Sequence, residues 1–352
     1  MALVNAGLAS GITVGLDIGD KQSHICVVDS NGEILEEGVV RTTPEALRQR
    51  FGGDPCRVAL EASTHSPWIA RLLDELKHQV IVANPHALRL IAQSGRKNDR
   101  NDAQLLAYFG RIDPARLGPI RHRGLQAQAD LALIRSRDAL VRSRTLLINC
   151  VRGTLKAFGV RVPAGTGHAF HRRATDCVPP ELALAIMPLL TSIETLDHQI
   201  AEMERSVERI AEERYPQTRA LRQIAGVGPL TALTFVLVVE DPHRFAKSRD
   251  IGAYLGLTPG QRQSGERSPQ MSITKAGDHL LRRLLIQAAH YVMGPFGPPS
   301  DLRAWGQLKA PAGNPALKKR ALVAVARKLA VLMHHLWVTG EVYEAVRQPA
   351  VA

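Results

Sequence analysis

Long apolar runs and aromatic side chains are both scarce in this sequence of 352 residues. No run of about 18 uninterrupted apolar residues occurs, which excludes a conventional membrane span. Residues 1–9 lack the basic and then apolar pattern of a secretory signal peptide. Aromatic residues make up only 4% of the chain, so Leu, Ile, Val and Ala must supply most of any core.

Cysteine is also rare, and the cysteines are too far apart to form a C-x-x-C pair. This spacing excludes a zinc ribbon and a disulfide scaffold, and it favours a reducing compartment. We therefore expect a cytoplasmic protein. The four cysteines are Cys26, Cys56, Cys150 and Cys177.

Acidic residues are outnumbered, because 45 Lys and Arg stand against 33 Asp and Glu, which gives a net charge of +12. Such an excess of positive charge favours a polyanionic partner, and nucleic acid is the commonest one. The hydrophobic content of 45% is enough for a sizeable core, and the length suits two or three domains.

The first third of the chain has the pattern of an α/β domain, which we place at residues 10–120. Short apolar runs predict strands at residues 12–16, 23–28, 34–40, 57–60 and 80–82. A hairpin signal, Ser30-Asn31-Gly32, joins the second strand to the third, and Thr43-Pro44 predicts the start of a helix. A meander of three strands followed by alternating strands and helices is the order of the ribonuclease-H-like fold.

The middle region, residues 121–215, begins with a basic helix predicted over residues 125–158. Residues 121–160 contain eight Lys or Arg and two acids, a balance suited to lying along phosphates. The alternative is a solvated helix face with ordinary surface charge. Residues 160–180 are rich in Gly, Pro and His and predict a linker. The residues that we expect to contact nucleic acid here are Arg135, Arg142, Arg144 and Arg152.

The clearest periodicity in the chain follows this linker. Nine apolar residues alternate at spacings of four and three, which is the a/d seam of a coiled coil. The pattern predicts self-association through this helix, and the alternative is a helix packed on its own domain. The nine residues are Leu182, Ile186, Leu189, Ile193, Leu196, Ile200, Met203, Val207 and Ile210.

Four carboxylates lie where a ribonuclease-H-like fold would bring them together. Asp17 and Glu61 each end a predicted strand, and Asp99 and Asp102 share one helix face at spacing i, i+3. Four converging carboxylates repel one another unless cations bind, and hard oxygen ligands suit Mg²⁺ or Mn²⁺. Asp17 could instead be a turn residue, and Asp99 could merely cap a helix.

The last region, residues 216–345, is predicted to be mainly helical. Residues 221–236 have the helix-hairpin-helix pattern, in which Gly226 and Gly228 would let backbone amides hold a phosphate. A plain glycine turn between packed helices is the alternative. We expect further nucleic-acid contacts from cationic residues along this region, namely Arg262, Lys275, Lys318 and Lys319.

A polar loop at residues 256–268 contains the pair Ser264-Gly265. A serine hydroxyl there could attack phosphate if a metal or a base activates it. Spacing alone gives this hypothesis little support, because Ser268 and Ser272 compete with Ser264.

Several motifs together resemble the IS-110-type family of insertion-sequence transposases and the related Piv-type DNA invertases. The resemblance covers nearly the whole chain. It depends on GLDIGDKQSH, VALEAS, KNDRNDAQLLA, IAGVGPLTA, YLGLTPGQRQSG, TKAGDHLLRRLL and ALVAVARKLAVLM.

The resemblance implies an N-terminal RuvC-like domain with a DEDD tetrad, here Asp17, Glu61, Asp99 and Asp102, and a C-terminal transposase domain with a serine nucleophile, here Ser264. It also implies a Mg²⁺-dependent site composed across subunits, a covalent phosphoserine link to DNA, dimers that pair into tetramers, and a structured guide RNA that pairs with donor and target DNA. This chain departs from the family pattern at two positions: Asn98 replaces a Thr beside the acidic helix, and Glu266 replaces a second Gly after the Ser-Gly pair.

We therefore expect a site-specific DNA recombinase of the transposase type. A metal-dependent junction nuclease would need the tetrad but not Ser264, and a non-catalytic nucleic-acid-binding scaffold would need neither. A sugar-kinase-like or actin-like nucleotide phosphatase shares the first strand and hairpin, but a later Asp-x-Gly-Gly motif is absent from the sequence.

Overall fold

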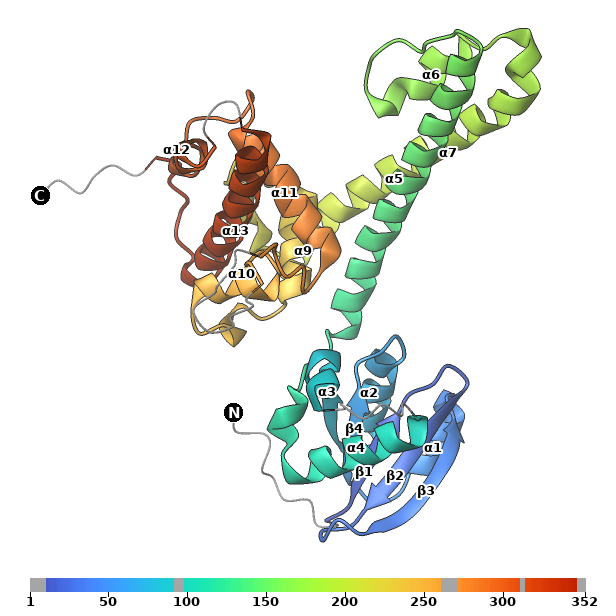
Figure 1. Cartoon of the computed structure of the whole chain (residues 1–352), viewed down its shortest axis with the longest axis vertical. Coiled ribbons are helices and arrows are strands. Elements are labelled where there is room, and N and C mark those ends of the chain that lie inside the picture. Colours follow the sequence, from blue (N-terminus) through green and yellow to red (C-terminus); the bar gives the residue numbers. More distant parts are fainter. Residues whose placement is uncertain (1–10, 92–97, 261–270, 311–313, 347–352) are drawn as a thin grey trace, which may run out of the picture. The chain divides into compact units, whose positions relative to one another are not determined.

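The computed structural model describes residues 11–91, 98–260, 271–310 and 314–346. The chain folds as two compact units, residues 1–124 and 125–352 (Figure 1). All of the predicted middle region except residues 121–124 thus belongs to the same compact unit as the predicted C-terminal domain. The N-terminal unit contains a sheet, and the other unit is mostly helical in its described part.

The N-terminal unit is built on one five-stranded sheet of order β3-β2-β1-β4-β5. Strands β1, β2 and β3 are antiparallel neighbours, whereas β4 and β5 run parallel to β1. This confirms the α/β class and the initial meander, and the strand order is compatible with a ribonuclease-H-like fold. The strands are β1 Thr13–Asp17, β2 Gln22–Val28, β3 Ile34–Arg41, β4 Arg57–Glu61 and β5 Gln79–Ala83.

Local side chains define the turns and helix ends, as the sequence predicted. One carboxylate oxygen of Asp29 accepts hydrogen bonds from the backbone of Asn31, Gly32 and Glu33, which closes the β2–β3 hairpin. Thr43 caps α1 by accepting from the amide of Ala46 at 3.3 Å. The helices of this unit are α1 Pro44–Phe51, α2 Ser66–Glu75, α3 Pro85–Ile91 and α4 Asp99–Ile112.

One face of the sheet packs against α1 and α2. Val14 and Leu16 on β1 and Leu60 on β4 are buried there together with Leu47 of α1 and Ile69 of α2. The alternation of a strand therefore sends residues 13, 15 and 17 to the opposite face.

Helix α4 covers this opposite face at unusually close range. A Cβ added to Gly15 would lie 2.0 Å from the carbonyl oxygen of Ala103 and 2.5 Å from the amide of Ala107. Further along α4, a Cβ on Gly110 would lie 2.8 Å from the Cβ of Ala59. Glycine and alanine at these contacts let the helix backbone rest directly on β1 and β4.

The second unit is mostly helical in its described part, as predicted for the C-terminal region. Its long helices α5 and α7 pack against each other (Figure 1). The helices are α5 Leu125–Ala157, α6 Phe170–Thr175, α7 Ala183–Glu213, α8 Thr218–Arg222, α9 Pro229–Val239, α10 Ile251–Tyr254, α11 His279–Met293, α12 Asp301–Leu308 and α13 Pro315–Thr339.

Most of the predicted a/d seam is buried within its own chain, while Leu189, Leu196 and Met203 are half-buried. Ile186 and Ile193 cluster with Val151 and Leu155 of α5. Near the other end of α7, Val207 belongs to the core that also contains residues of α5. Packing inside the unit therefore accounts for much of the periodicity, and self-association through this helix stays a prediction.

The predicted linker at residues 160–180 is partly wrong, because it contains the short helix α6. Phe170 is completely buried, and the guanidinium carbon of Arg152 lies 5.1 Å from its ring centre. Phe170 and Ala174 add one turn of apolar surface to the α5–α7 pair, which outweighs the turn-favouring composition around them.

Helix α13 is long and apolar enough to span a membrane by length and composition, and half of its most apolar window is buried inside the protein. Val325, Leu329 and Met333 are all completely buried in the core of the second unit. The apolar character of α13 thus fits its place as a core helix packed against α11 and α12.

Candidate active site

Strand register brings two of the predicted carboxylates and one histidine together at one edge of the sheet. Asp17, the last residue of β1, pairs directly with His24 of β2. On the other side, Leu16 pairs with Leu60, so Glu61 at the end of β4 follows beside Asp17. Asp17, His24 and Glu61 all alternate with residues of the opposite face and therefore lie on the face that α4 covers.

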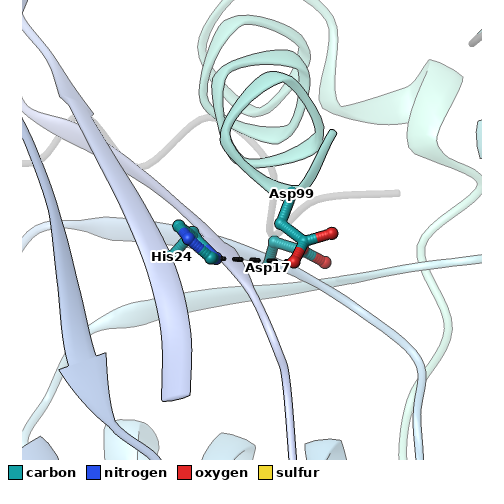
Figure 2. Close-up of side chains that lie close together, drawn as sticks. All are labelled: Asp17, His24 and Asp99. Atoms are coloured by element: carbon teal, nitrogen blue, oxygen red, sulfur yellow. Dashed lines mark ion pairs between the residues drawn. The ribbon is translucent and has the colours of Figure 1, made fainter. Parts of the chain in front are cut away.

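The first turn of α4 completes the cluster. Asn98 caps the helix by accepting a hydrogen bond from the amide of Arg100 at 3.1 Å, so Asp99 and Asp102 both fall in the first turn. Ligand atoms of Asp17, His24 and Asp99 lie within 4.8 Å of one another, and Figure 2 shows the three side chains converging. His24 Nδ1 and Asp99 Oδ2 are 3.9 Å apart.

The raised pKa of Asp17 is a second sign that these carboxylates lie close together. Burial, reinforced by the charges of Asp102, Asp99 and Glu61, raises the pKa of Asp17 to about 6, and His24 opposes the rise. The three other predicted carboxylates therefore lie close enough to Asp17 for their charges to change its pKa. The N-terminus of α4 points its partial positive charge at this cluster, which offsets part of the repulsion.

This donor set fits a divalent cation. Asp17 and Asp99 present oxygen ligands and His24 a nitrogen ligand, while Glu61 and Asp102 lie near enough to act on the charge of Asp17. Hard carboxylate oxygens suit Mg²⁺ and Mn²⁺, and a bound cation would offset both the burial and the repulsion that raise the pKa of Asp17.

His24 is the member of this cluster that the sequence analysis missed. A usable signal was present, because the turn residues Gly19-Asp20 lie between two predicted antiparallel strands. Pairing these strands across the turn places position 24 opposite position 17, which is the register observed. Choosing the correct register between these two strands would have been enough to predict that His24 lies opposite Asp17.

The four predicted nucleic-acid contacts on α5 have different environments. Arg135 forms an ion pair with Asp278 at 3.1 Å, and Arg142, 68% exposed, pairs with Asp138 at 3.2 Å. Arg144 is mostly buried and lies 2.6 Å from a carboxylate oxygen of the buried Asp197. Arg152 lies over the ring of Phe170, as described above. Of the three arginines that form ion pairs, Arg142 is thus the most exposed, whereas Arg144 is held inside the protein by Asp197.

The glycine turn at residues 226–228 does join two helices, α8 and α9. Gly226 has φ +88°, and a Cβ there would lie 3.1 Å from the carbonyl oxygen of Ala288. Gly228 is the N-cap residue of α9 and has no neighbour within 4 Å of an added Cβ. The open position at Gly228 leaves room for a phosphate, while the close packing at Gly226 fits a structural turn, so both interpretations remain.

Ser264 and Arg262 lie outside the described residues. The residues that flank them are paired: Pro259 bridges Ile273, and the amide of Gly260 donates to the carbonyl oxygen of Ser272 at 2.9 Å. This short pairing forms the base of the serine segment, by which we mean residues 261–270.

A buried arginine supports the turns next to this base. The guanidinium of Arg282 donates to the carbonyl oxygens of Leu255 at 3.0 Å and Ala276 at 2.6 Å. Lys275 adopts φ +57° beside these turns. The remaining two predicted cationic contacts, Lys318 and Lys319, are exposed near the start of α13.

Two family models match this chain. A model described as "DEDD_Tnp_IS110: Transposase" matches residues 14–159, and one described as "Transposase IS116/IS110/IS902 family" matches residues 218–302. The first match includes all four carboxylates of the cluster, and the second includes the glycine turn and the position of Ser264.

Curated relatives cover most of the chain. It is 33% identical over 299 residues, 80% of this chain and 83% of the relative, to the transposase for insertion sequence element IS1328 of Yersinia enterocolitica. It is 28% identical to the transposase for insertion sequence element IS1111A of Coxiella burnetii, over 94% of this chain and 90% of the relative. It is 24% identical to the pilin gene-inverting protein of Moraxella lacunata, over 91% and 94% of the two chains.

Proposed function

We propose a mechanism from one premise: this chain belongs to the IS116/IS110/IS902 family of transposases and is an enzyme that recombines DNA. In the proposal, Asp17, Glu61, Asp99 and Asp102 form a RuvC-like DEDD centre for Mg²⁺ or Mn²⁺. Ser264 is the nucleophile that cuts the strand and keeps the phosphate bound until it is rejoined.

The observation that supports this proposal most directly is the clustering of carboxylates around Asp17. Burial, reinforced by the charges of three other acids from β4 and α4, raises the pKa of Asp17 to about 6, which is unfavourable for folding at neutral pH and is relieved when a cation binds. Such a cluster is expected where metal-assisted phosphoryl chemistry takes place. The bound cation would supply Lewis-acid stabilisation of negative charge on the phosphate.

The residues of the chain perform the remaining steps. The Ser264 hydroxyl oxygen attacks the scissile phosphorus, the bond from phosphorus to the departing strand breaks, and that strand's oxygen takes up a proton while the serine proton is released. In rejoining, a strand hydroxyl attacks the phosphoserine and the serine oxygen is reprotonated. One phosphoester replaces another at each step, so no external energy source is required.

His24 has a defined place in this proposal. Its Nδ1 lies 3.9 Å from Asp99 Oδ2, and its ligand atom is within the 4.8 Å cluster (Figure 2). We place it as a nitrogen ligand or as a partner that holds Asp99. A nitrogen ligand would favour Mn²⁺ over Mg²⁺, because imidazole suits transition metals.

The proposal is tested by trapping the covalent intermediate. The full-length protein is incubated with DNA carrying the ends of its own element and with any RNA that copurifies, and adducts are resolved under denaturing conditions. We expect an adduct that yields phosphoserine, that disappears in Ser264→Ala and in Asp17→Asn, and that persists in the matched controls Ser268→Ala and Ser272→Ala. An adduct that survives Ser264→Ala would overturn the assignment of the nucleophile.

A metal-dependent nuclease is the second candidate, because the described cluster contains what metal-assisted hydrolysis needs without any serine. Free cleavage that persists in Ser264→Ala and is lost in Asp17→Asn would favour this candidate. Intact DNA transactions in Asp17→Asn would instead favour a non-catalytic scaffold.

We infer from the resemblance that a structured guide RNA binds this protein and that it assembles as dimers which pair into tetramers. The net charge of +12 and the exposed cations of α5 support binding to such an RNA. Sequencing the nucleic acid recovered from the purified protein tests the first inference. Light scattering after size-exclusion chromatography tests the second, and a monomer bound to DNA alone would overturn both.

A further inference from the structure

A groove of about 1050 Å³ crosses the second unit between α12, α13 and the base of the serine segment. Its floor is largely apolar, and two of its apolar side chains are exposed, Leu308 at 85% and Met271 at 40%. Exposed apolar side chains beside a groove of this size mark a binding surface. The apolar and aromatic lining includes Pro259, Met271, Ile273, Trp305 and Leu308.

The charge of the groove is of one sign. Among the described residues that line it, all charged side chains are cations, and neither Asp nor Glu occurs. Within the described part of the chain, none of these cations forms an ion pair with a carboxylate. They are Lys309, Lys319, Arg320, Arg327 and Lys328.

Trp305 holds two of these cations over its ring. The ammonium nitrogen of Lys328 lies 4.5 Å from the ring centre and that of Lys309 lies 5.1 Å from it. A cation over an aromatic face is stabilised without losing its charge, so both ammonium groups stay available to an anion. The groove therefore offers positive charge directly beside apolar surface.

This combination distinguishes between forms of nucleic acid. A duplex presents phosphates and sugars and hides the faces of its bases, so it gains little from an apolar floor. A single strand exposes base faces as well as phosphates, and proteins bind it with aromatic side chains that stack on its bases inside positively charged grooves.

The position of the groove beside the serine segment indicates which nucleic acid it binds. Pro259, Met271, Ser272 and Ile273, which flank that segment, all line the groove, and Ser264 follows Gly260 by four positions in the sequence. We propose that this groove binds a single DNA strand next to the phosphate that is cut, with its bases against the apolar floor and its phosphates on the cations. The choice of DNA rests on the proposed function, in which Ser264 acts on DNA.

The test measures binding of a short fluorescent oligothymidylate by anisotropy at about 50 to 200 mM salt, a range over which phosphate contacts strongly change affinity. The double variant Lys319→Ala/Arg320→Ala removes two exposed cations. We expect about tenfold weaker binding and a salt dependence whose log-log slope falls by about 1.4, at 0.7 per phosphate contact on a single strand.

A variant of the floor separates apolar from ionic binding. Leu308→Ser replaces a side chain that is 85% exposed, so the fold is expected to be unchanged. Affinity should fall a few-fold with the salt slope unchanged. The matched control Lys247→Ala/Arg249→Ala removes two exposed cations of the same unit outside the groove and should bind the single strand like the unaltered protein.

Three outcomes would overturn the proposal: unchanged affinity in both groove variants, an equal loss for a blunt duplex, or a loss confined to oligouridylate, which would make the groove an RNA site. The adduct experiment keeps the proposed function separate. If groove variants lose single-strand binding while the unaltered protein forms no Ser264-dependent adduct, the groove stands and the phosphoserine mechanism falls.

Discussion

In the N-terminal unit the candidate chemistry is presented by a sheet, whereas in the second unit the cations and the apolar floor are presented by helices. Strand pairing places Asp17, His24 and Glu61 side by side, and one helix start adds Asp99 and Asp102. In the groove, residues of α12, α13 and a loop base meet only through packing. Side chains that are positioned by the register of β-strands can shift little relative to one another. A groove between helices can adjust its width to a flexible nucleic-acid strand.

The largest expected effect comes from the contact that sets α4 on the sheet. Gly15→Val should cost about 3 kcal/mol or more, because a Cβ meets the α4 backbone rather than a movable side chain. Urea unfolding should show the loss in the N-terminal unit, with the helical unit melting as before. Gly53→Ala, where an added Cβ meets nothing within 4 Å, is the control and should change stability little.

A comparable effect is expected from an arginine that the sequence suggested as a nucleic-acid contact. Arg144→Ala should cost about 3 kcal/mol, because it leaves the buried Asp197 without its closest cationic partner. Arg142→Ala is the matched comparison and should leave stability nearly unchanged while weakening nucleic-acid binding. Thermal melting and a salt-dependent binding series measure the two quantities. The reverse pattern would make Arg144 the contact and Arg142 the structural residue.

Asp17→Asn tests how much the buried negative charge of Asp17 destabilises the fold. The folded-state pKa of about 6 lies above the ordinary value of 3.8, so the group's contribution to stability is fully present below about pH 3.8 and is lost as the pH rises through about 6. Two pKa units correspond to about 3 kcal/mol, which solvent screening of this partly exposed group reduces to about 1–2 kcal/mol.

Without divalent cations at neutral pH, Asp17→Asn should therefore be more stable than the unaltered protein, and the difference should vanish at pH 4. Adding Mn²⁺ should raise the melting temperature of the unaltered protein and not that of the variant. A stability difference that is independent of pH would contradict the assigned cause of the pKa shift.

The smallest effect is expected at His24. His24→Gln should weaken Mn²⁺ binding by about tenfold, or about 1.4 kcal/mol, and should remove the nitrogen coupling from the electron spin echo spectrum of the bound ion. His65→Gln is the control, because His65 contacts Asp20 outside the cluster at 3.2 Å. Tight Mn²⁺ binding without nitrogen coupling in the unaltered protein would rule out His24 as a ligand and leave the carboxylate centre intact.

Much of the N-terminal unit was predictable because its signals are local. The cap at Thr43 and the hairpin after β2 depend on residues within a few positions of one another. Asp17 and Glu61 were found because each ends an apolar run, where a carboxylate stands out. His24 was missed because its role depends on a register between two strands rather than on its own neighbours.

The helical unit was harder to predict, since a heptad pattern specifies an apolar stripe without naming its partner. The seam of α7 packs on α5 of the same chain, and α6 forms where Phe170 can be buried between them. The groove could not be predicted at all. Lys319 was expected to contact nucleic acid, but nothing in the sequence linked it to Trp305, and the two line one cavity only when α12 and α13 pack.

By itself the sequence determined the identity and order of the acids, the strand ends and helix starts that carry them, and the excess of positive charge, because each depends on composition or short-range pattern. Tertiary structure alone decided that His24 faces Asp17, that α4 approaches β1 at Gly15, and that five cations surround one apolar floor. The first depends on the register that two neighbouring strands adopt, and the other two are distances between residues far apart in the chain, which close packing sets and no local pattern encodes.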